Sequence, residues 1–158
     1  MTDLDPQEAL PVGEPGRPGG NRGLRPGFVR VVALLLAVGP ASALIVASRL
    51  QPDSRGLGTH QQLGLPPCSM RMLFGIRCPG CGMTTSWAYF TQGEWLASAQ
   101  ANVAGFLLAW FSLAVTVIAV RSVVTGCPPS IRIQKVATLG GVAIMVVAFL
   151  NWGWCLMA

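Results

Sequence analysis

Three long blocks of the sequence carry no charged side chain. They run from Val31 to Ser48, from Trp95 to Val120 and from Val136 to Ala158. Each block reaches the roughly 18 residues that a helix needs to cross the hydrocarbon core of a bilayer. Only 11% of the residues are charged, whereas about a quarter of an ordinary soluble domain is charged. We therefore expect a membrane protein.

The pattern predicts an all-α membrane protein with three transmembrane helices and a short interfacial helix. The first 26 residues are rich in proline and glycine and lack apolar periodicity, which is typical of a disordered tail. The rest, residues 27–158, is expected to form one membrane domain with a cysteine-bearing loop at residues 49–94. The expected spans are residues 29–48, 97–120 and 136–157.

The first apolar block has an alternative interpretation as a cleaved signal peptide. Residues 41–43 read Ala-Ser-Ala, which resembles a cleavage site, and an apolar core precedes them at residues 28–38. However, the preceding region is long and contains four acidic residues, and the apolar run continues through Val46. We favour a retained helix. In both cases the chain that follows emerges on the same side of the membrane.

The basic residues near the expected spans favour a bacterial inner-membrane protein with a cytoplasmic N-terminus. On this topology seven bases lie inside: Arg17, Arg22, Arg25, Arg30, Arg121, Arg132 and Lys135. Four lie outside, in the long loop: Arg49, Arg55, Arg71 and Arg77. The bases flank apolar blocks and form no basic face interleaved with aromatic residues, so the net charge of +5 does not indicate nucleic-acid binding.

Small residues recur at four-residue spacing in each expected span, which favours close packing of helices. We therefore expect the bilayer as a partner, together with a second copy or another membrane protein. These small residues are Gly39, Ala43, Ala47, Ala101, Gly105, Ala109, Ala137 and Gly141.

The interfacial helix is expected to begin at Met83 or Thr84, with Thr84 or Thr85 as its N-cap. Gly93 should end this helix. Glu94 would then lie at the positive N-terminal end of the second span.

The cysteines carry the most distinctive chemistry in the chain. Cys127 is expected on the cytoplasmic side, and the other four on the outer side: Cys68, Cys78, Cys81 and Cys155. The tight element is Cys78-Pro79-Gly80-Cys81-Gly82. Proline fixes the turn, and the two glycines permit positive φ, so that backbone N–H groups can point at the sulfurs.

Three interpretations of this turn remain open. A disulfide or other structural staple requires only the oxidising side of the membrane. A zinc site requires four ligands, of which Cys68, Cys78 and Cys81 would supply three and Cys155 or His60 the fourth. A redox-active dithiol of Cys78 and Cys81 lacks the βαβ surroundings of the thioredoxin type. We expect a non-enzymatic module that is stapled or holds a metal, with a membrane thiol-disulfide oxidoreductase as the alternative.

The run from Cys68 through Asn102 resembles the bacterial membrane proteins of domain-of-unknown-function family twenty-seven fifty-two, whose motif is Cys-Pro-x-Cys-Gly-x-Thr-Arg. The matching residues are Cys68, Gly75, Cys78, Pro79, Cys81, Gly82, Thr84, Gly93 and Asn102. Thr85 stands where the family has Arg, and Val103 where it usually has Pro. The first difference removes a fixed positive charge beside the cysteines. The resemblance covers about residues 65–125 and implies a membrane module without implying a mechanism.

Overall fold

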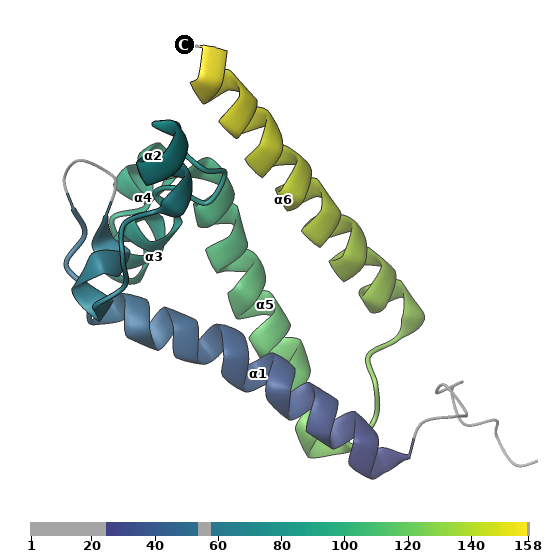
Figure 1. The fold of residues 1–158 in the computed structure, drawn as a ribbon. Helices are drawn as coiled ribbons and strands as arrows, with labels where there is room; N and C mark the ends of the chain where they lie inside the picture. Colours follow the sequence, from purple (N-terminus) through teal and green to yellow (C-terminus); the bar gives the residue numbers. More distant parts are fainter. Residues whose placement is uncertain (1–24, 54–57, 158) are drawn as a thin grey trace, which may run out of the picture.

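The fold consists of three long helices and a group of short helices gathered at one end (Figure 1). The computed structural model describes residues 25–53 and 58–157, apart from the side chain of Cys155. Nearly all of the expected N-terminal tail lies outside these residues. No strand occurs in the described ranges, which confirms the all-α prediction. The elements are α1 (Pro26–Ser48), the 3-10 helix η1 (Thr59–Leu63), α2 (Ser69–Phe74), α3 (Met83–Thr91), α4 (Trp95–Ala101), α5 (Val103–Thr125) and α6 (Ile131–Met157).

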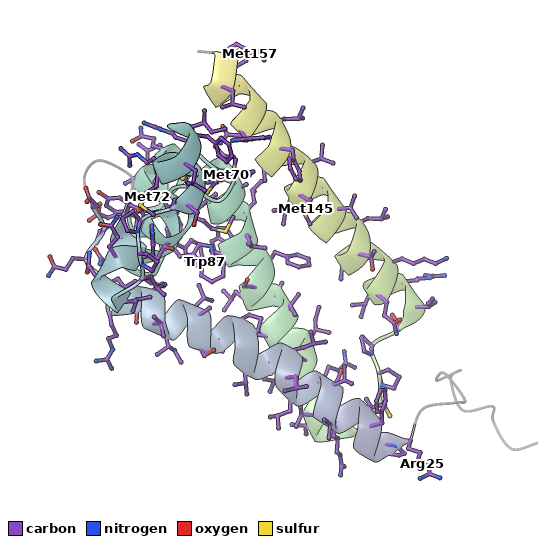
Figure 2. The ribbon with its side chains drawn as sticks, viewed as in Figure 1. Arg25, Met70, Met72, Trp87, Met145 and Met157 are labelled. Atoms are coloured by element: carbon purple, nitrogen blue, oxygen red, sulfur yellow. The ribbon has the colours of Figure 1, made fainter. Side chains whose placement is uncertain are left out.

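The helices α1, α5 and α6 are long and apolar enough to cross a membrane, with mean hydropathies of 2.3, 2.4 and 1.9. They run alternately up and down, so that η1, α2, α3 and α4 lie at the same end of the bundle as the end of α6 (Figure 1). Figure 2 shows Met70 and Met72 at this end and Arg25 at the opposite end. The five-residue connection between α5 and α6 is shorter than the sequence pattern indicated, because both helices extend beyond the uncharged blocks.

Helix α1 packs against α5 through small side chains. Its buried positions are Val29, Ala33, Ala37 and Ala47, and those of α5 include Ala109, Ser112 and Ala119. Small side chains let two helix backbones approach closely in a bilayer, where no hydrophobic force draws helices together. Of the small residues expected on α1, Ala47 is buried, whereas Gly39 and Ala43 are exposed. Helix α1 thus contacts α5 through a different face from the one that the spacing of its small residues predicted.

Helix α6 contacts α5 alone among the helices of the described chain. Gly140 lies beneath Phe111 of α5, where an added Cβ would be 3.5 Å from the aromatic ring. At the end of the bundle where η1, α2, α3 and α4 gather, which we call the cysteine end, Nε1 of Trp152 donates a hydrogen bond of 2.6 Å to the carbonyl of Arg77. Because none of the apolar span of α6 is buried within the protein, most of its surface is available to lipid or to a partner.

The expected second span is divided at Asn102. Helix α4 ends at Ala101, Asn102 is extended (φ −164°, ψ 110°), and α5 begins at Val103. Glu94 therefore precedes α4 rather than the membrane helix, and its side chain forms no capping hydrogen bond. The break occurs because the side chain of Asn102 caps α5 by accepting a hydrogen bond of 2.8 Å from the N–H of Gly105.

Helix α3 begins at Met83, as the sequence indicated, but its N-cap is Gly82 with φ +85°. The expectation that Thr84 or Thr85 caps it is therefore wrong. Both threonines lie inside the helix, and Thr85 is buried against Thr59 of η1, with 2.8 Å between the two hydroxyl oxygens.

Helix α3 lies very close to the start of α5. Ser86 of α3 and Ser98 of α4 are fully buried, their hydroxyl oxygens are 3.0 Å apart, and Ser86 also donates to the carbonyl of Asn102. Nε1 of Trp87 donates a 2.9 Å hydrogen bond to the carbonyl of Gly105. A Cβ on Gly105 would be only 3.0 Å from the Cβ of Ser86, so glycine is needed here for the two helices to approach.

The close contact at Gly105 gives a stability prediction. Replacing Gly105 with alanine should destabilise the protein by about 1–3 kcal/mol, because the new methyl group overlaps Ser86 and the backbone of Met83. The matched control is Gly39→Ala in α1, where nothing lies within 4 Å of the added Cβ and the helix gains up to about 1 kcal/mol. Thermal unfolding in detergent measures both. Equal melting temperatures for the two variants would contradict the assigned contact.

Candidate functional site

Three cysteines converge at the cysteine end of the bundle. Cys68 immediately precedes α2, and Cys78 and Cys81 lie in the turn before α3. Their three Sγ atoms lie within 4.8 Å of one another, and those of Cys78 and Cys81 are 3.3 Å apart. All three side chains are partly buried. The structure thus brings together the three loop cysteines that the sequence analysis selected.

The turn that holds Cys78 and Cys81 is fixed by its backbone. The N–H of Cys81 donates to the carbonyl of Cys78 at 3.0 Å, and that of Met83 donates to the carbonyl of Gly80 at 3.1 Å. Gly82 has the positive φ that the sequence suggested, whereas Gly80 does not. Gly80 contributes instead through its backbone N–H, which interacts with the sulfur of Cys78. These features place both sulfurs on one side of the turn.

Asn102 connects this turn to the membrane helix. Its Nδ2 donates a hydrogen bond of 3.0 Å to the carbonyl of Cys81, while its Oδ1 caps α5. The side chain is almost fully buried, with 4% of the residue exposed. The two ends of one amide thus fix the position of Cys81 relative to α5. This role accounts for the asparagine at the start of α5 in this chain.

Cys68 and Cys78 differ in their electrostatic surroundings. The backbone N–H of Arg71, followed by the thiol of Cys78, lowers the pKa of Cys68. Burial, followed by hydrogen bonding with Cys81, raises the pKa of Cys78 to about 12. Of these two thiols, Cys68 therefore ionises more readily in the metal-free protein, and hydrogen bonds from neighbouring donors stabilise its thiolate.

The cysteines line a pocket of about 520 Å³ together with His60, Arg71 and Thr84. His60, one of the two expected fourth ligands, faces this pocket but lies outside the 4.8 Å cluster. The side chain of Cys155, the other candidate, is not among those described. The hydrogen bond between Trp152 and Arg77 nevertheless brings the last turns of α6 to the residue that precedes Cys78. Cys127 is exposed in the connection at the opposite end of the bundle.

Two contributors to the site were missed by the sequence analysis. Arg71 supplies a positive charge at the pocket. Thr85 stands at the position of the family's arginine, and its hydroxyl is hydrogen-bonded to that of Thr59. The paired hydroxyls of Ser86 and Ser98 hold α3 and α4 together beneath the turn. The two serines themselves were the available signal, because hydroxyls that become buried require partners.

Comparison with known proteins supports the resemblance. Residues 68–116 match the family described as "Protein of unknown function (DUF2752)". The match starts at Cys68, includes the turn with Cys78 and Cys81, and continues into α5. The chain therefore resembles this family over the segment that forms the candidate site. No curated protein and no solved structure matches the chain.

The difference between Cys68 and Cys78 predicts an order of alkylation in the metal-free protein. At pH 8 iodoacetamide should modify Cys68 faster than Cys78 by about tenfold or more, because the thiolate is the reacting form. Raising the pH should accelerate modification of Cys78 up to about pH 12, whereas modification of Cys68 should level off at lower pH. Peptide mass spectrometry after limited labelling measures both rates. Equal rates at pH 8 would show that the pKa difference does not exist.

Proposed function

We propose that the cysteine end of this membrane protein is a metal centre, in which Cys68, Cys78 and Cys81 bind a zinc ion. The observation that carries the proposal is the convergence of three sulfurs within 4.8 Å. In a tetrahedral zinc site the Zn–S distance is about 2.3 Å, which separates the sulfurs by less than about 4 Å. The cluster is close to this arrangement and needs only small adjustments of side chains.

The third sulfur favours a metal over a structural disulfide. A disulfide uses two sulfurs and would leave the third thiol beside it. A neighbouring thiolate attacks disulfides and reshuffles them, and Cys68 is the residue whose pKa is lowered. A metal instead uses all three sulfurs. The backbone N–H groups of Gly80 and Arg71, which interact with the sulfurs of Cys78 and Cys68, further stabilise thiolate ligands.

Zinc with three thiolates carries a net charge of −1, which Arg71 at the pocket can offset. His60, Cys155 or a water molecule would complete the tetrahedron. The bound ion would join the start of α2 to the turn before α3, so that metal binding contributes directly to the stability of this end of the protein. On this proposal the module is structural rather than enzymatic.

A bacterial inner-membrane location with a cytoplasmic N-terminus completes the proposal. The described bases Arg25, Arg30, Arg121, Arg132 and Lys135 belong to the end of the bundle where α1 begins and α5 joins α6. Basic residues near helix ends favour the cytoplasmic side. The metal centre would then lie on the outer side.

The second candidate is a membrane thiol-disulfide oxidoreductase that uses Cys78 and Cys81. The 3.3 Å separation of their sulfurs favours it, because a small movement would allow a disulfide to form. In this case the pair would exchange electrons with a dithiol or disulfide of another protein, and Cys68 would be a neighbouring thiol. Both candidate functions use the sulfurs of Cys78 and Cys81. They differ in metal content and in the oxidation state of the thiols, so measuring these two properties distinguishes them.

Elemental analysis tests the metal proposal directly. Protein purified in detergent should contain about one zinc ion per chain, and its three loop cysteines should resist alkylation until a chelator is added. Cys68→Ser and Cys81→Ser should weaken zinc binding by at least about tenfold, whereas Cys127→Ser, the matched control, should retain it.

Protein without metal, in which two thiols react only after reduction, would contradict the metal proposal. The oxidoreductase would then be supported if Cys81→Ser accumulates a mixed disulfide with another protein. A structural disulfide would be supported if no such adduct forms.

The orientation is tested separately by labelling intact spheroplasts with a membrane-impermeant maleimide. Cys127 should react only after lysis, because its connection lies on the cytoplasmic side. A cysteine introduced as Leu65→Cys, at an exposed loop position, should react before lysis. The reverse pattern would overturn the orientation without affecting the metal proposal.

A further inference from the structure

Helix α2 (Ser69–Phe74) is held by few contacts within the protein. None of its residues is buried, and in the described chain it contacts no other helix, whereas η1, α3 and α4 at the same end each contact a neighbouring helix. A single helix of six residues is not stable in water, because its few hydrogen bonds do not offset the entropy lost in forming the first turn. The surroundings of α2 must therefore supply contacts that the chain does not.

Three consecutive large apolar side chains end this helix. Met72, Leu73 and Phe74 are between 62% and 75% exposed, and exposed arginines stand on both sides of them, at positions 71 and 77. Apolar side chains accompanied by basic ones are typical of segments that lie in the interface of a membrane. The basic side chain places its charge among the head groups and its methylene stem along apolar surface.

The hydrogen bond between Trp152 and Arg77 sets the depth of this segment. From Lys135, where the apolar stretch of α6 begins, to Trp152 the helix rises about 26 Å, at about 1.5 Å per residue. The hydrocarbon core is about 30 Å thick, so Trp152 lies near its far edge, where tryptophan is enriched. The carbonyl of Arg77, 2.6 Å from Nε1 of Trp152, lies at the same level.

Helix α2 lies close to this level. Phe74 precedes Arg77 by three residues, a stretch of chain that spans at most about 11 Å. In Figure 1 the last turns of α6 extend beyond α2, and in Figure 2 Met157 lies beyond Met70 and Met72. The exposed apolar end of α2 is therefore at the depth where head groups meet acyl chains, and not in the aqueous phase beyond the membrane.

We propose that α2 inserts Met72, Leu73 and Phe74 into the lipid leaflet at the cysteine end. The three side chains would enter the boundary between head groups and acyl chains, about 5–10 Å deep, and Arg77 would lie among the head groups. Helix α6 passes the same level with none of its apolar span buried, so the lipid that surrounds α6 also reaches α2. A lipid boundary covers both surfaces at once, which favours it over a protein partner.

The cysteine pocket shares side chains with α2. Arg71 and Met72 line that pocket, so it opens at the level of the lipid head groups. A molecule that reaches the cysteines would then approach through the membrane interface. The insertion of α2 follows from the positions of the helices and holds whether or not the cysteines bind zinc.

The test uses the full-length protein in phosphatidylcholine nanodiscs that contain a phospholipid with a photoreactive diazirine. The diazirine is placed either beside the glycerol, as a shallow probe, or at the end of an acyl chain, as a deep probe. Trypsin cleaves after Arg71 and Arg77 and so isolates residues 72–77 for mass spectrometry. The shallow probe should label this peptide about fivefold or more above the deep probe, because insertion stops about 5–10 Å into the leaflet. Residues 136–158, which include most of α6, should be labelled by both probes.

A double variant, Leu73→Gln with Phe74→Gln, tests the apolar side chains. Shallow-probe labelling of residues 72–77 should fall about fivefold or more, because glutamine does not favour the acyl boundary. Val124→Gln is the matched control, since Val124 is 74% exposed at the opposite end of the bundle, and it should leave this labelling unchanged. Circular dichroism checks that each variant is folded. If the double variant does not fold, the comparison of the two probes on the unaltered protein decides the result.

Labelling of residues 72–77 by neither probe, or equally by both, would overturn the proposal, as would unchanged labelling in the double variant. A stable dimer in which these residues are unlabelled would also overturn it and would identify a second copy as the partner of α2.

Discussion

The arrangement of the cysteine end depends on the side chain of Asn102. Its Oδ1 caps α5 through the N–H of Gly105, and its Nδ2 holds the carbonyl of Cys81. Asparagine combines an acceptor and a donor in one short, planar group. An ionised aspartate lacks the donor and leucine lacks both, so neither can form the two bonds. In a nearly dry environment each of these bonds also satisfies a group whose burial would otherwise cost about 1–3 kcal/mol. The cysteine turn is therefore fixed to the membrane helix by hydrogen bonds.

The short helices are held beneath the turn by further polar contacts in a small volume. The Ser98 hydroxyl donates to the carbonyl of Ser86, and the Ser86 hydroxyl donates to the carbonyl of Asn102. The hydroxyls of Thr59 and Thr85 bond to each other. No buried side-chain nitrogen or oxygen in the described chain lacks a partner. Aromatic rings complete the packing, with Trp110 of α5 meeting Phe90 and Trp95 edge to face at 5.2 and 5.7 Å. Complete pairing of polar groups gives this end a specific geometry.

The sequence was sufficient to identify three spanning helices and the convergent cysteines, because both have local signatures. An uncharged block predicts a span from its own length, and a Cys-x-x-Cys turn brings its sulfurs together without help from distant residues. The break at Asn102 was not foreseen, since residues 95–120 are apolar on both sides of it and only the tertiary contact with Cys81 distinguishes it. The contact face of α1 was misjudged because alanine and glycine are frequent all around that helix.

The position of His60 at the pocket could not be predicted from the sequence pattern either. It depends on the buried contact between Thr59 and Thr85, two residues far apart in the sequence. The sequence pattern relates the charge of Arg71 to membrane topology only. Its place at the site depends on how α2 faces the cysteine turn, which the pattern does not show. Side-chain neighbours of this kind are set by loop geometry, which hydropathy and motif spacing do not encode.

The hydrogen bonds of the cysteine end also imply an order of assembly during synthesis. Those that fix the turn join residues no more than 26 positions apart, and all of their partners lie before residue 106. The bond between Trp152 and Arg77 instead spans 75 positions. Local contacts close early, and N-terminal parts of a chain fold first as it emerges from the ribosome. The cysteine end can therefore be complete while α6 is still being translated, and α6 arrives last on a preformed surface.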